Sequence, residues 1–221
     1  MERLEERLVM AADFGDAPDT GAGTGTGNYQ TLSANDGPQH DTFTTRTTLF
    51  LGNRVDRETN ASPNSRANGD DIVATLPDDE DGVIEPAQDL LLTADTVPVV
   101  RLRAKNTTGS AATLYGWIDF NRDGVFDNAT ERTSVVVPIG SNSATFTLTF
   151  PTIPLDTDAG QTYARFRLST DLAAADATGA ALNGEVEDYA ATITHQGDGT
   201  AELFGLDRVV LDEASGRSHV R

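Results

Sequence analysis

Hydrophobic and polar residues alternate along much of the chain with the period of two that half-buried β-strands show. In Val97–Lys105 apolar residues alternate with Arg101, Arg103 and Lys105, and Thr162–Thr170 alternates in the same way. Turn-forming residues follow both segments. The pattern therefore predicts two strands, each with one face on a hydrophobic core.

Other segments extend this set of strands. Leu114–Phe120 is apolar on both faces and predicts a central strand. Thr133–Ile139 and Ala144–Phe150 flank Gly140-Ser141-Asn142, so they predict a hairpin. Thr42–Leu51 predicts an edge strand, and Tyr189–His195 predicts the last strand of the domain.

Short strands at regular spacing, many turns and little helix predict an all-β fold, a β-sandwich of immunoglobulin-like or jelly-roll topology. A long irregular N-terminal section and acidic loops precede and interrupt the strands. We expect a leader-adjacent segment at 1–12, one sandwich domain at 13–195, and a linker or tail at 196–221. Met1–Ala12 has the spacing of a short amphipathic helix.

The chain is strongly acidic, with 35 Asp and Glu against 16 Lys and Arg and a formal net charge of −19. Such a surface repels nucleic acid and anionic membranes, so neither is an expected partner. No apolar run is long enough for a membrane span. With no Cys and 3 His, oxygen ligands are the only plentiful metal ligands, which favours calcium (Ca2+) over zinc.

One acidic loop has the spacing of a calcium site. Oxygen-bearing side chains occupy alternate positions before Gly124, as in the D-x-[DN]-x-[DN]-G pattern. Glu131 lies one residue beyond the position of that pattern's closing glutamate. The candidate ligands are Asp119, Asn121, Asp123, the Val125 carbonyl, Asp127 and Glu131. The flanking segments predict strands, so we expect a calcium loop between two strands rather than an EF-hand.

The alternative interpretation of this loop is a metal-free turn, because Asp, Asn and Gly favour turns. It explains Gly124 and one or two of the acids. It does not explain why several carboxylates should converge without a counter-ion. Calcium is therefore the favoured interpretation.

A second candidate metal site joins acids that are distant in sequence. We expect three acidic motifs to meet at one edge of the sandwich, where a cation would tie the irregular first third to the core. Its candidate ligands are Asp13, Asp16, Asp78, Asp79, Glu80, Asp81, Glu185, Glu187 and Asp188. For Glu185 and Glu187, pairing with Arg165 and Arg167 on a neighbouring strand is an equally weighted alternative.

Several motifs occur in the order of a known family. They are DFGDAPD at 13–19, YQTLSANDGPQH at 29–40, LFLGNRV at 49–55, DDEDGV at 78–83, LYGWIDFNRDGVFD at 114–127, YARFRLSTD at 163–171 and GEVEDY at 184–189. Together they resemble the GEVED domain of large secreted and cell-surface bacterial proteins, many of them adhesin-like. Leu4–Ala12 also resembles the segment that precedes such domains in long planctomycete-type surface proteins.

The resemblance implies an extracellular, calcium-stabilised β module with a structural or adhesive role, followed or preceded by further domains of a longer chain. It implies no catalytic residues, and we expect no enzyme. The alternative function is a calcium-dependent module that binds a surface glycan or a peptide. A hydrolase with clustered carboxylates is the less favoured third class, because no acid pair is marked out. Tyr115 and Trp117 are expected in the core rather than on a glycan-binding face.

Overall fold

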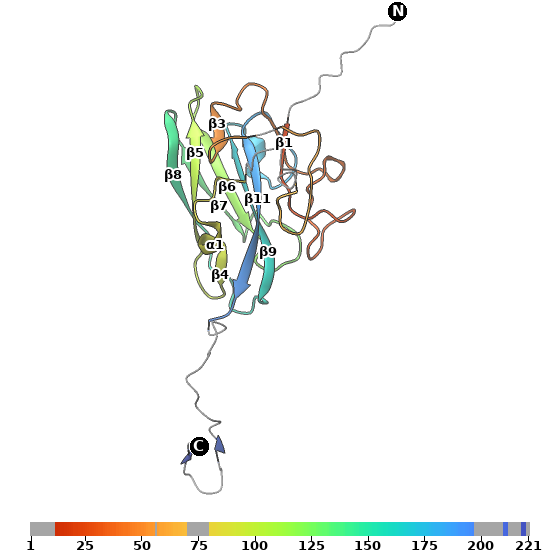
Figure 1. The fold of residues 1–221 in the computed structure, drawn as a ribbon, viewed down its shortest axis with the longest axis vertical. Helices are drawn as coiled ribbons and strands as arrows, with labels where there is room; N and C mark the ends of the chain where they lie inside the picture. The colour runs from red at the N-terminus through yellow and green to blue at the C-terminus, as the bar shows by residue number, and fades with distance from the viewer. Residues whose placement is uncertain (1–11, 56, 70–79, 197–209, 212–217, 220–221) are drawn as a thin grey trace, which may run out of the picture.

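A computed structural model describes residues 12–55, 57–69 and 80–196 and two short strands in the tail, β12 (Val210–Leu211) and β13 (Ser218–His219). The fold is nearly all β, with two main sheets stacked face to face (Figure 1). The predicted β-sandwich is confirmed. None of the helices in the described part of the chain is long and apolar enough to cross a membrane.

The larger sheet has five strands in the order β4-β11-β9-β6-β7. All its neighbours are antiparallel except β11 and β4, which run parallel. The strands are β4 (Leu91–Thr93), β6 (Ala112–Ile118), β7 (Arg132–Val137), β9 (Gly160–Ser169) and β11 (Glu185–Thr194).

The smaller sheet has three antiparallel strands, β3 (Leu49–Leu51), β5 (Val99–Asn106) and β8 (Ser141–Thr149), in the order β3-β5-β8. It covers one face of the larger sheet. The main core lies between the two sheets and includes Leu51, Leu102, Leu114, Leu148 and Phe166, all nearly inaccessible to solvent.

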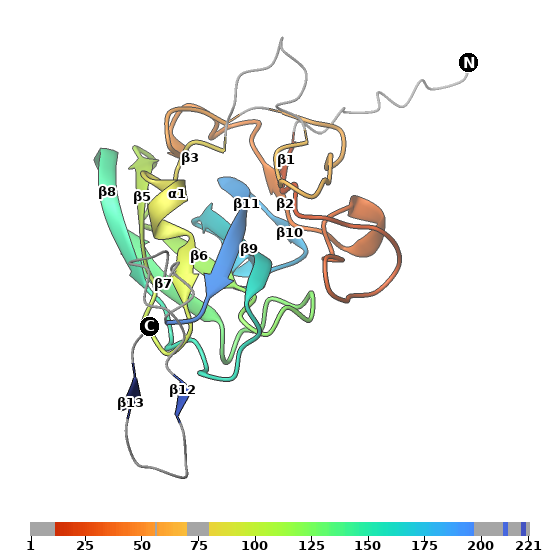
Figure 2. The ribbon, with the colours of Figure 1, turned by 60° about the horizontal axis from the view of Figure 1, so that its bottom comes forward.

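The opposite face of the larger sheet is also buried. Alternate residues of β6 and β9, including Trp117 and Tyr163, pack there against Tyr29 and Phe126. The cover comes from the N-terminal section and the loop before β11, joined by a small sheet of β1 (Ala12–Phe14), β2 (Gln39–Asp41) and β10 (Ala180–Ala181) (Figure 2). Trp117 is fully buried and Tyr115 nearly so, which confirms both as core residues.

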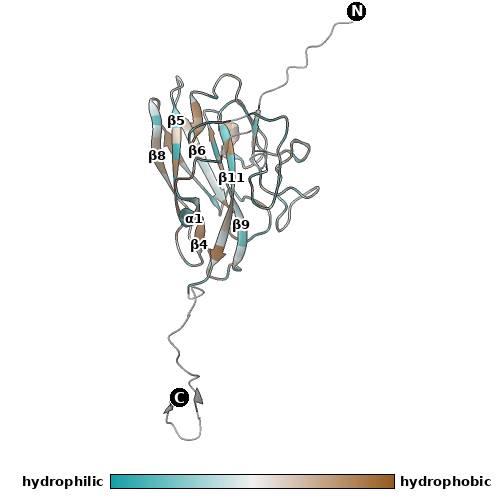
Figure 3. Ribbon diagram, in the orientation of Figure 1, coloured by the Kyte–Doolittle hydropathy of each residue, from teal (hydrophilic) through white to brown (hydrophobic). Residues whose placement is uncertain are grey.

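Between Ala12 and Gln196, helical structure in the described residues is limited to single turns. They are α1 (Pro86–Asp89) and the 3-10 turns η1 (Ser33–Asn35) and η2 (Leu172–Ala175). In Figure 3 the polar α1 contrasts with the brown, hydrophobic β4 that follows it. The sequence pattern missed α1 and β4, because both are too short to show a period.

The predicted hairpin of Thr133–Ile139 and Ala144–Phe150 is wrong. β7 pairs with β6 in the larger sheet, whereas β8 pairs with β5 in the smaller one. The turn between them therefore carries the chain from one layer to the other. Buried Asn106 fastens this corner, because its Nδ2 donates to the Val137 carbonyl at 2.9 Å and its carbonyl accepts from Gly140 N–H at 2.8 Å.

Other strand predictions hold with shifted ends. The strand over Leu114–Phe120 is interior to its sheet, as expected of an apolar segment. The edge strand predicted for Thr42–Leu51 does lie at a sheet edge, but only Leu49–Leu51 is extended. The last strand begins at Glu185, four residues before the predicted start at Tyr189. Residues 1–11 of the helix predicted for Met1–Ala12 lie outside the described residues, and Ala12 begins the strand β1 instead.

Candidate metal centre and buried acidic network

A buried ion pair links the two longest strands of the larger sheet. The antiparallel register of β9 and β11 places Asp188 directly beside Arg165. Both oxygens of the carboxylate are used, with Arg165 Nε 2.7 Å from Oδ1 and Nη2 2.8 Å from Oδ2. Both side chains have zero exposed area. Such a bidentate contact is among the stronger polar interactions in proteins.

All five N–H groups of Arg165 have acceptors. Besides Asp188, they reach the carbonyls of Gln30 and Ala177 at 3.0 and 2.9 Å and the Thr31 hydroxyl at 2.9 Å. The guanidinium therefore ties β9 to the N-terminal section and to the loop before β11. It has no donor left for a ligand.

Asp188 also holds the start of the domain. Its Oδ2 accepts from the Ala17 N–H at 2.8 Å. A Cβ on Gly15 would lie 2.3 Å from the same oxygen, closer than any side chain permits. The DFGD motif thus needs glycine at this position because the chain passes directly over the Asp188 carboxylate.

The other acids of the GEVEDY motif make the same kind of contact. Glu187 accepts from the Gly82 N–H at 3.0 Å and from the Tyr189 hydroxyl at 3.0 Å. A Cβ on Gly82 would lie 2.3 Å from a Glu187 oxygen. Glu185 accepts from the Leu51 N–H on β3. These side chains therefore connect the larger sheet to β3 and to the chain before α1.

Asp13 and Asp16 extend the network at its N-terminal end. Asp13 accepts from the Val186 N–H of β11 at 2.6 Å. Asp16 accepts from the N–H groups of Ser62 and Gly69 at 3.0 and 2.6 Å, which closes the loop between them. We call Asp13, Asp16, Glu185, Glu187, Asp188 and Arg165 the buried acidic network.

The described acids of these motifs lie along the first half of β11, with Glu185 and Glu187 on the core side of the larger sheet and Asp188 on the other side. The hydrogen bonds described above join them to backbone N–H groups, to the Tyr189 hydroxyl and to Arg165. Asp81 belongs to the same region and accepts from the Asn53 N–H at 2.8 Å. Glu80 is partly buried beside it, and Asp78 and Asp79 lie outside the described residues. Metal binding by these acids stays a prediction.

The alternative of Glu185 and Glu187 pairing with Arg165 and Arg167 is wrong. Glu185 and Glu187 stand opposite Leu168 and Phe166 in the register, whose side chains face the core between the sheets. The arginines point to the other face of the larger sheet, where Asp188 lies. Glu185, Glu187 and Asp188 are close in sequence, but the two-residue period of a strand places Asp188 on the opposite face from the two glutamates.

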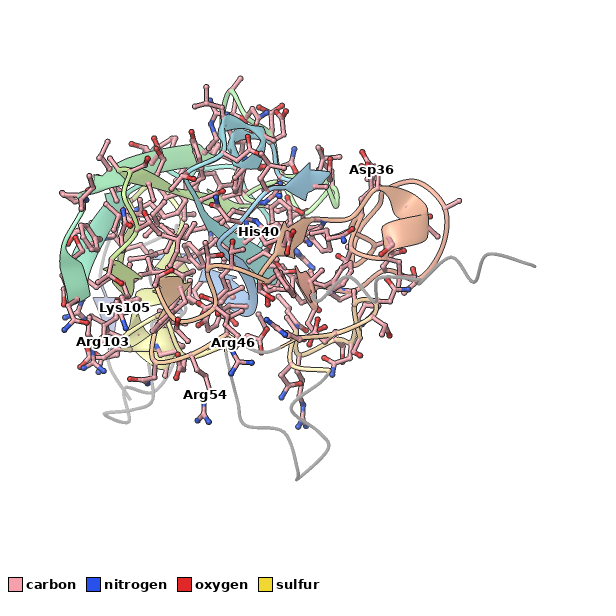
Figure 4. All side chains as sticks on the ribbon, turned by 90° about the horizontal axis from the view of Figure 1, so that it is seen from above. Asp36, His40, Arg46, Arg54, Arg103 and Lys105 are labelled. Atoms are coloured by element: carbon pink, nitrogen blue, oxygen red, sulfur yellow. The ribbon has the colours of Figure 1, made fainter. Side chains whose placement is uncertain are left out.

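Arg167 has an unusual partner, His40 of β2. Its Nε donates to His40 Nε2 at 2.9 Å, and Nδ1 of the ring lies 2.8 Å from the Asn183 carbonyl. The ring is therefore neutral, with Nδ1 protonated. Burial, followed by the charge of Arg167, lowers the pKa of His40 well below its usual value. Figure 4 shows His40 enclosed by other side chains, while Arg46 and Arg54 project outward.

The loop between β6 and β7 is organised by two buried carboxylates. Asp119 Oδ2 accepts from the Gly124 N–H at 2.9 Å and from the Tyr29 hydroxyl at 2.7 Å. Gly124 has a φ of 81°, so the bend requires glycine. Burial raises the pKa of Asp119, because its charge is only partly balanced by these donors.

Glu131 closes the loop from the other end. Its two oxygens accept from the N–H groups of Phe120 and Asp127 at 2.8 and 2.9 Å. Burial raises the pKa of Glu131 to about 7. These contacts explain why Glu131 does not follow the register of a calcium ligand, since its side chain reaches backbone N–H groups.

The remaining candidate ligands are exposed on the loop. Asn121 donates to Asp123 Oδ2 at 2.9 Å, Asp123 Oδ1 accepts from the Val125 N–H at 2.8 Å, and Asp127 accepts from the N–H groups of Ala129 and Thr130. The donor set is all oxygen and suits calcium. Yet within the described ranges no three His, Cys, Asp or Glu side chains are gathered closely enough to hold a metal ion.

A cavity of about 390 Å³ lies beside this loop. It is lined by Val125 and Phe126 of the loop, by Asp36, and by Asp176 and its neighbours before β10. Arg165 also borders it, but its N–H groups are all taken. No sequence pattern marks this cavity, because its walls come from three segments far apart in the chain.

Comparisons with known proteins support the family resemblance. Residues 113–192 match the model of the GEVED domain, which confirms the resemblance over this segment. No curated protein matches the chain. Among solved structures, the chain is similar to the crystal structure of the CARDB domain of the PF1109 protein in complex with di-metal ions from Pyrococcus furiosus. That match has 12% identity and a TM-score of 0.30, and it covers 48% of this chain and 80% of that chain.

The ion pair gives a first prediction. Asp188→Asn leaves the Arg165 cation buried without its counter-charge, so we expect a loss of about 3–5 kcal/mol in the free energy of unfolding. Denaturant melts measure it. Glu85→Gln is the matched control, because it removes one charge from the exposed pair with Arg101 and should cost far less. Equal losses in the two variants would contradict the network's role.

A second prediction concerns pH. Below about pH 6.5 the unfolded chain gains a proton at His40, whereas the folded chain keeps this ring neutral. The free energy of unfolding therefore decreases as the pH is lowered, by up to about 1.4 kcal/mol per pH unit. The raised pKa of Glu131 acts in the opposite direction in the same window. The comparison with His40→Gln isolates the histidine, since Gln can accept from Arg167 and donate to Asn183 without titrating. If the free energy of unfolding of the parent and of His40→Gln changed in parallel from pH 7 to 5, the predicted contribution of His40 would be refuted.

Proposed function

We propose that this chain is a non-enzymatic, extracellular structural module of a longer bacterial surface protein, stabilised by calcium and serving to build or present an adhesive part. The observation that carries the proposal is the buried acidic network. The acidic residues of the motifs form hydrogen bonds that hold distant segments of the chain together, as expected of a structural module. The match to the GEVED domain supports a place in a surface protein, because the family resemblance implies such a context.

Within this proposal the Asp119–Asp127 loop is the calcium site. The side-chain oxygens of Asp119, Asn121, Asp123 and Asp127 and the Val125 carbonyl would hold the ion. Glu131 would organise the loop by accepting from the N–H groups of Phe120 and Asp127. The ion would neutralise an acidic loop whose buried carboxylate has a raised pKa, and so stabilise the fold.

Thermal melts with calcium and with chelator test the site. A ligand that binds only the folded chain adds about 2.7 kcal/mol at one hundred times its Kd, so we expect calcium to raise Tm. Asp123→Ala should remove most of this rise, because Asp123 is exposed and its loss leaves the buried carboxylates in place. Glu85→Gln, which removes one negative charge outside the Asp119–Asp127 loop, should retain the rise in Tm on adding calcium.

The outcomes separate the parts of the proposal. A Tm that is the same with calcium and with chelator would remove calcium from it. A calcium effect that survives in Asp123→Ala would move the ion to another acidic cluster. Neither outcome would affect the hydrogen-bonded network as the basis of the scaffold.

A glycan- or peptide-binding module is the second candidate, and the cavity beside the loop favours it. Volumes of about 300–1,000 Å³ are usual for ligand sites. Its walls include the carboxylates of Asp36 and Asp176, which suits a ligand rich in hydroxyl or other donor groups. Glycan-array binding that depends on calcium and is lost in Asp176→Asn would raise this function above the structural one.

A further inference from the structure

Two sheet edges lie side by side on one flank of the sandwich. β7 is the end strand of the larger sheet and β8 is the end strand of the smaller one. They are joined by the short connection Pro138–Gly140. In Figures 1 and 2 β8 lies at the periphery, and no other described segment covers its outer side. Such an edge presents unpaired backbone N–H and C=O groups.

The second half of β8 is regular and open. Its register with β5 is interrupted near Ser143, which has a φ of 54°, and is continuous from Ala144 to Thr149. A bulge of this kind protects an edge strand only locally. Beyond it, Thr145, Thr147 and Thr149 are exposed and β-branched. This half of the strand has none of the charges or prolines that commonly block edge-to-edge pairing.

The flank is also uncharged in a highly charged molecule. From Thr133 to Leu155 the sequence contains no Asp, Glu, Lys, Arg or His, the longest such stretch in the chain. Val136 and Ile139 are 58% and 57% exposed there. Elsewhere the net charge of −19 opposes the approach of a second acidic molecule. Two copies of this chain therefore meet least repulsion flank to flank.

We propose that β8 pairs antiparallel with β8 of a second copy of this chain over Ala144–Thr149. A two-fold axis then relates the copies, and both contribute the same surface. The smaller sheets join into one continuous sheet, with Val136 and Ile139 beside the junction. This inference goes beyond the proposed function and does not depend on calcium.

Salt dependence distinguishes this contact from charge-driven binding. Raising salt from about 0.01 M to 1 M shortens the Debye length from about 30 to 3 Å, so it screens the repulsion between copies. We expect the full chain to shift from monomer towards dimer in sedimentation velocity as salt rises. A monomer at every salt and protein concentration tested overturns the proposal, and so does a dimer that dissociates in salt.

Charge substitutions locate the contact. Thr147→Glu places like charges across the junction and should weaken dimerisation by about tenfold or more. Thr24→Glu gives the same net charge on an exposed loop of the N-terminal section and should leave the dimer unchanged. Far-UV circular dichroism and melting of both variants report whether they fold. A folded Thr147→Glu variant that dimerises like Thr24→Glu overturns the proposal.

Cross-linking tests the register, because the chain has no native cysteine. Single cysteines at Thr145, Thr147 and Thr149, oxidised alone and in pairwise mixtures, should give a disulfide dimer in at least one combination. A disulfide requires Cα atoms within about 7 Å, so only facing positions can react. Thr24→Cys should stay monomeric. Cross-linking no greater in the β8 set than in Thr24→Cys contradicts strand pairing.

Discussion

The fold depends on the neutralisation of charge inside the larger sheet. Arg165 and Asp188 are buried completely, and burying either ion alone would be strongly unfavourable. The pair is tolerable because every N–H of the guanidinium finds an acceptor. Most of those acceptors belong to the N-terminal section and the loop before β11. The cover of the outer face must therefore be in place before the ion pair is satisfied.

This dependence makes one unit of segments that are distant in sequence. Gly15 fits over Asp188 and Gly82 fits over Glu187, and in each case a side chain would collide with the carboxylate. The segments that contain Gly15 and Gly82 thus fit closely against the acidic side chains of the GEVEDY strand. Although the family model matches 113–192, the packing of this sheet extends back to Asp13.

The sequence predicted the features that depend on local pattern. The alternation in β5 and β9 and the apolar centre of β6 could both be inferred from residue types. The pairing of β7 with β6 and of β8 with β5 could not, because Gly140 permits a turn within a sheet and a turn between sheets equally well. Nor could the buried place of Arg165 and Arg167, since alternating arginines usually mark a solvent face. Their burial depends on a cover that has no periodic pattern of its own.

The acids of the β6–β7 loop divide into two groups, and the division bears on calcium. Asp119 and Glu131 are buried and accept backbone N–H groups, so they shape the loop whether or not an ion is bound. Asn121, Asp123 and Asp127 are exposed and bond only to near neighbours. Breaking such exposed local hydrogen bonds costs little free energy, because water can replace the partner. An ion therefore has to reorganise only the exposed group, on a backbone that the buried group already holds in place.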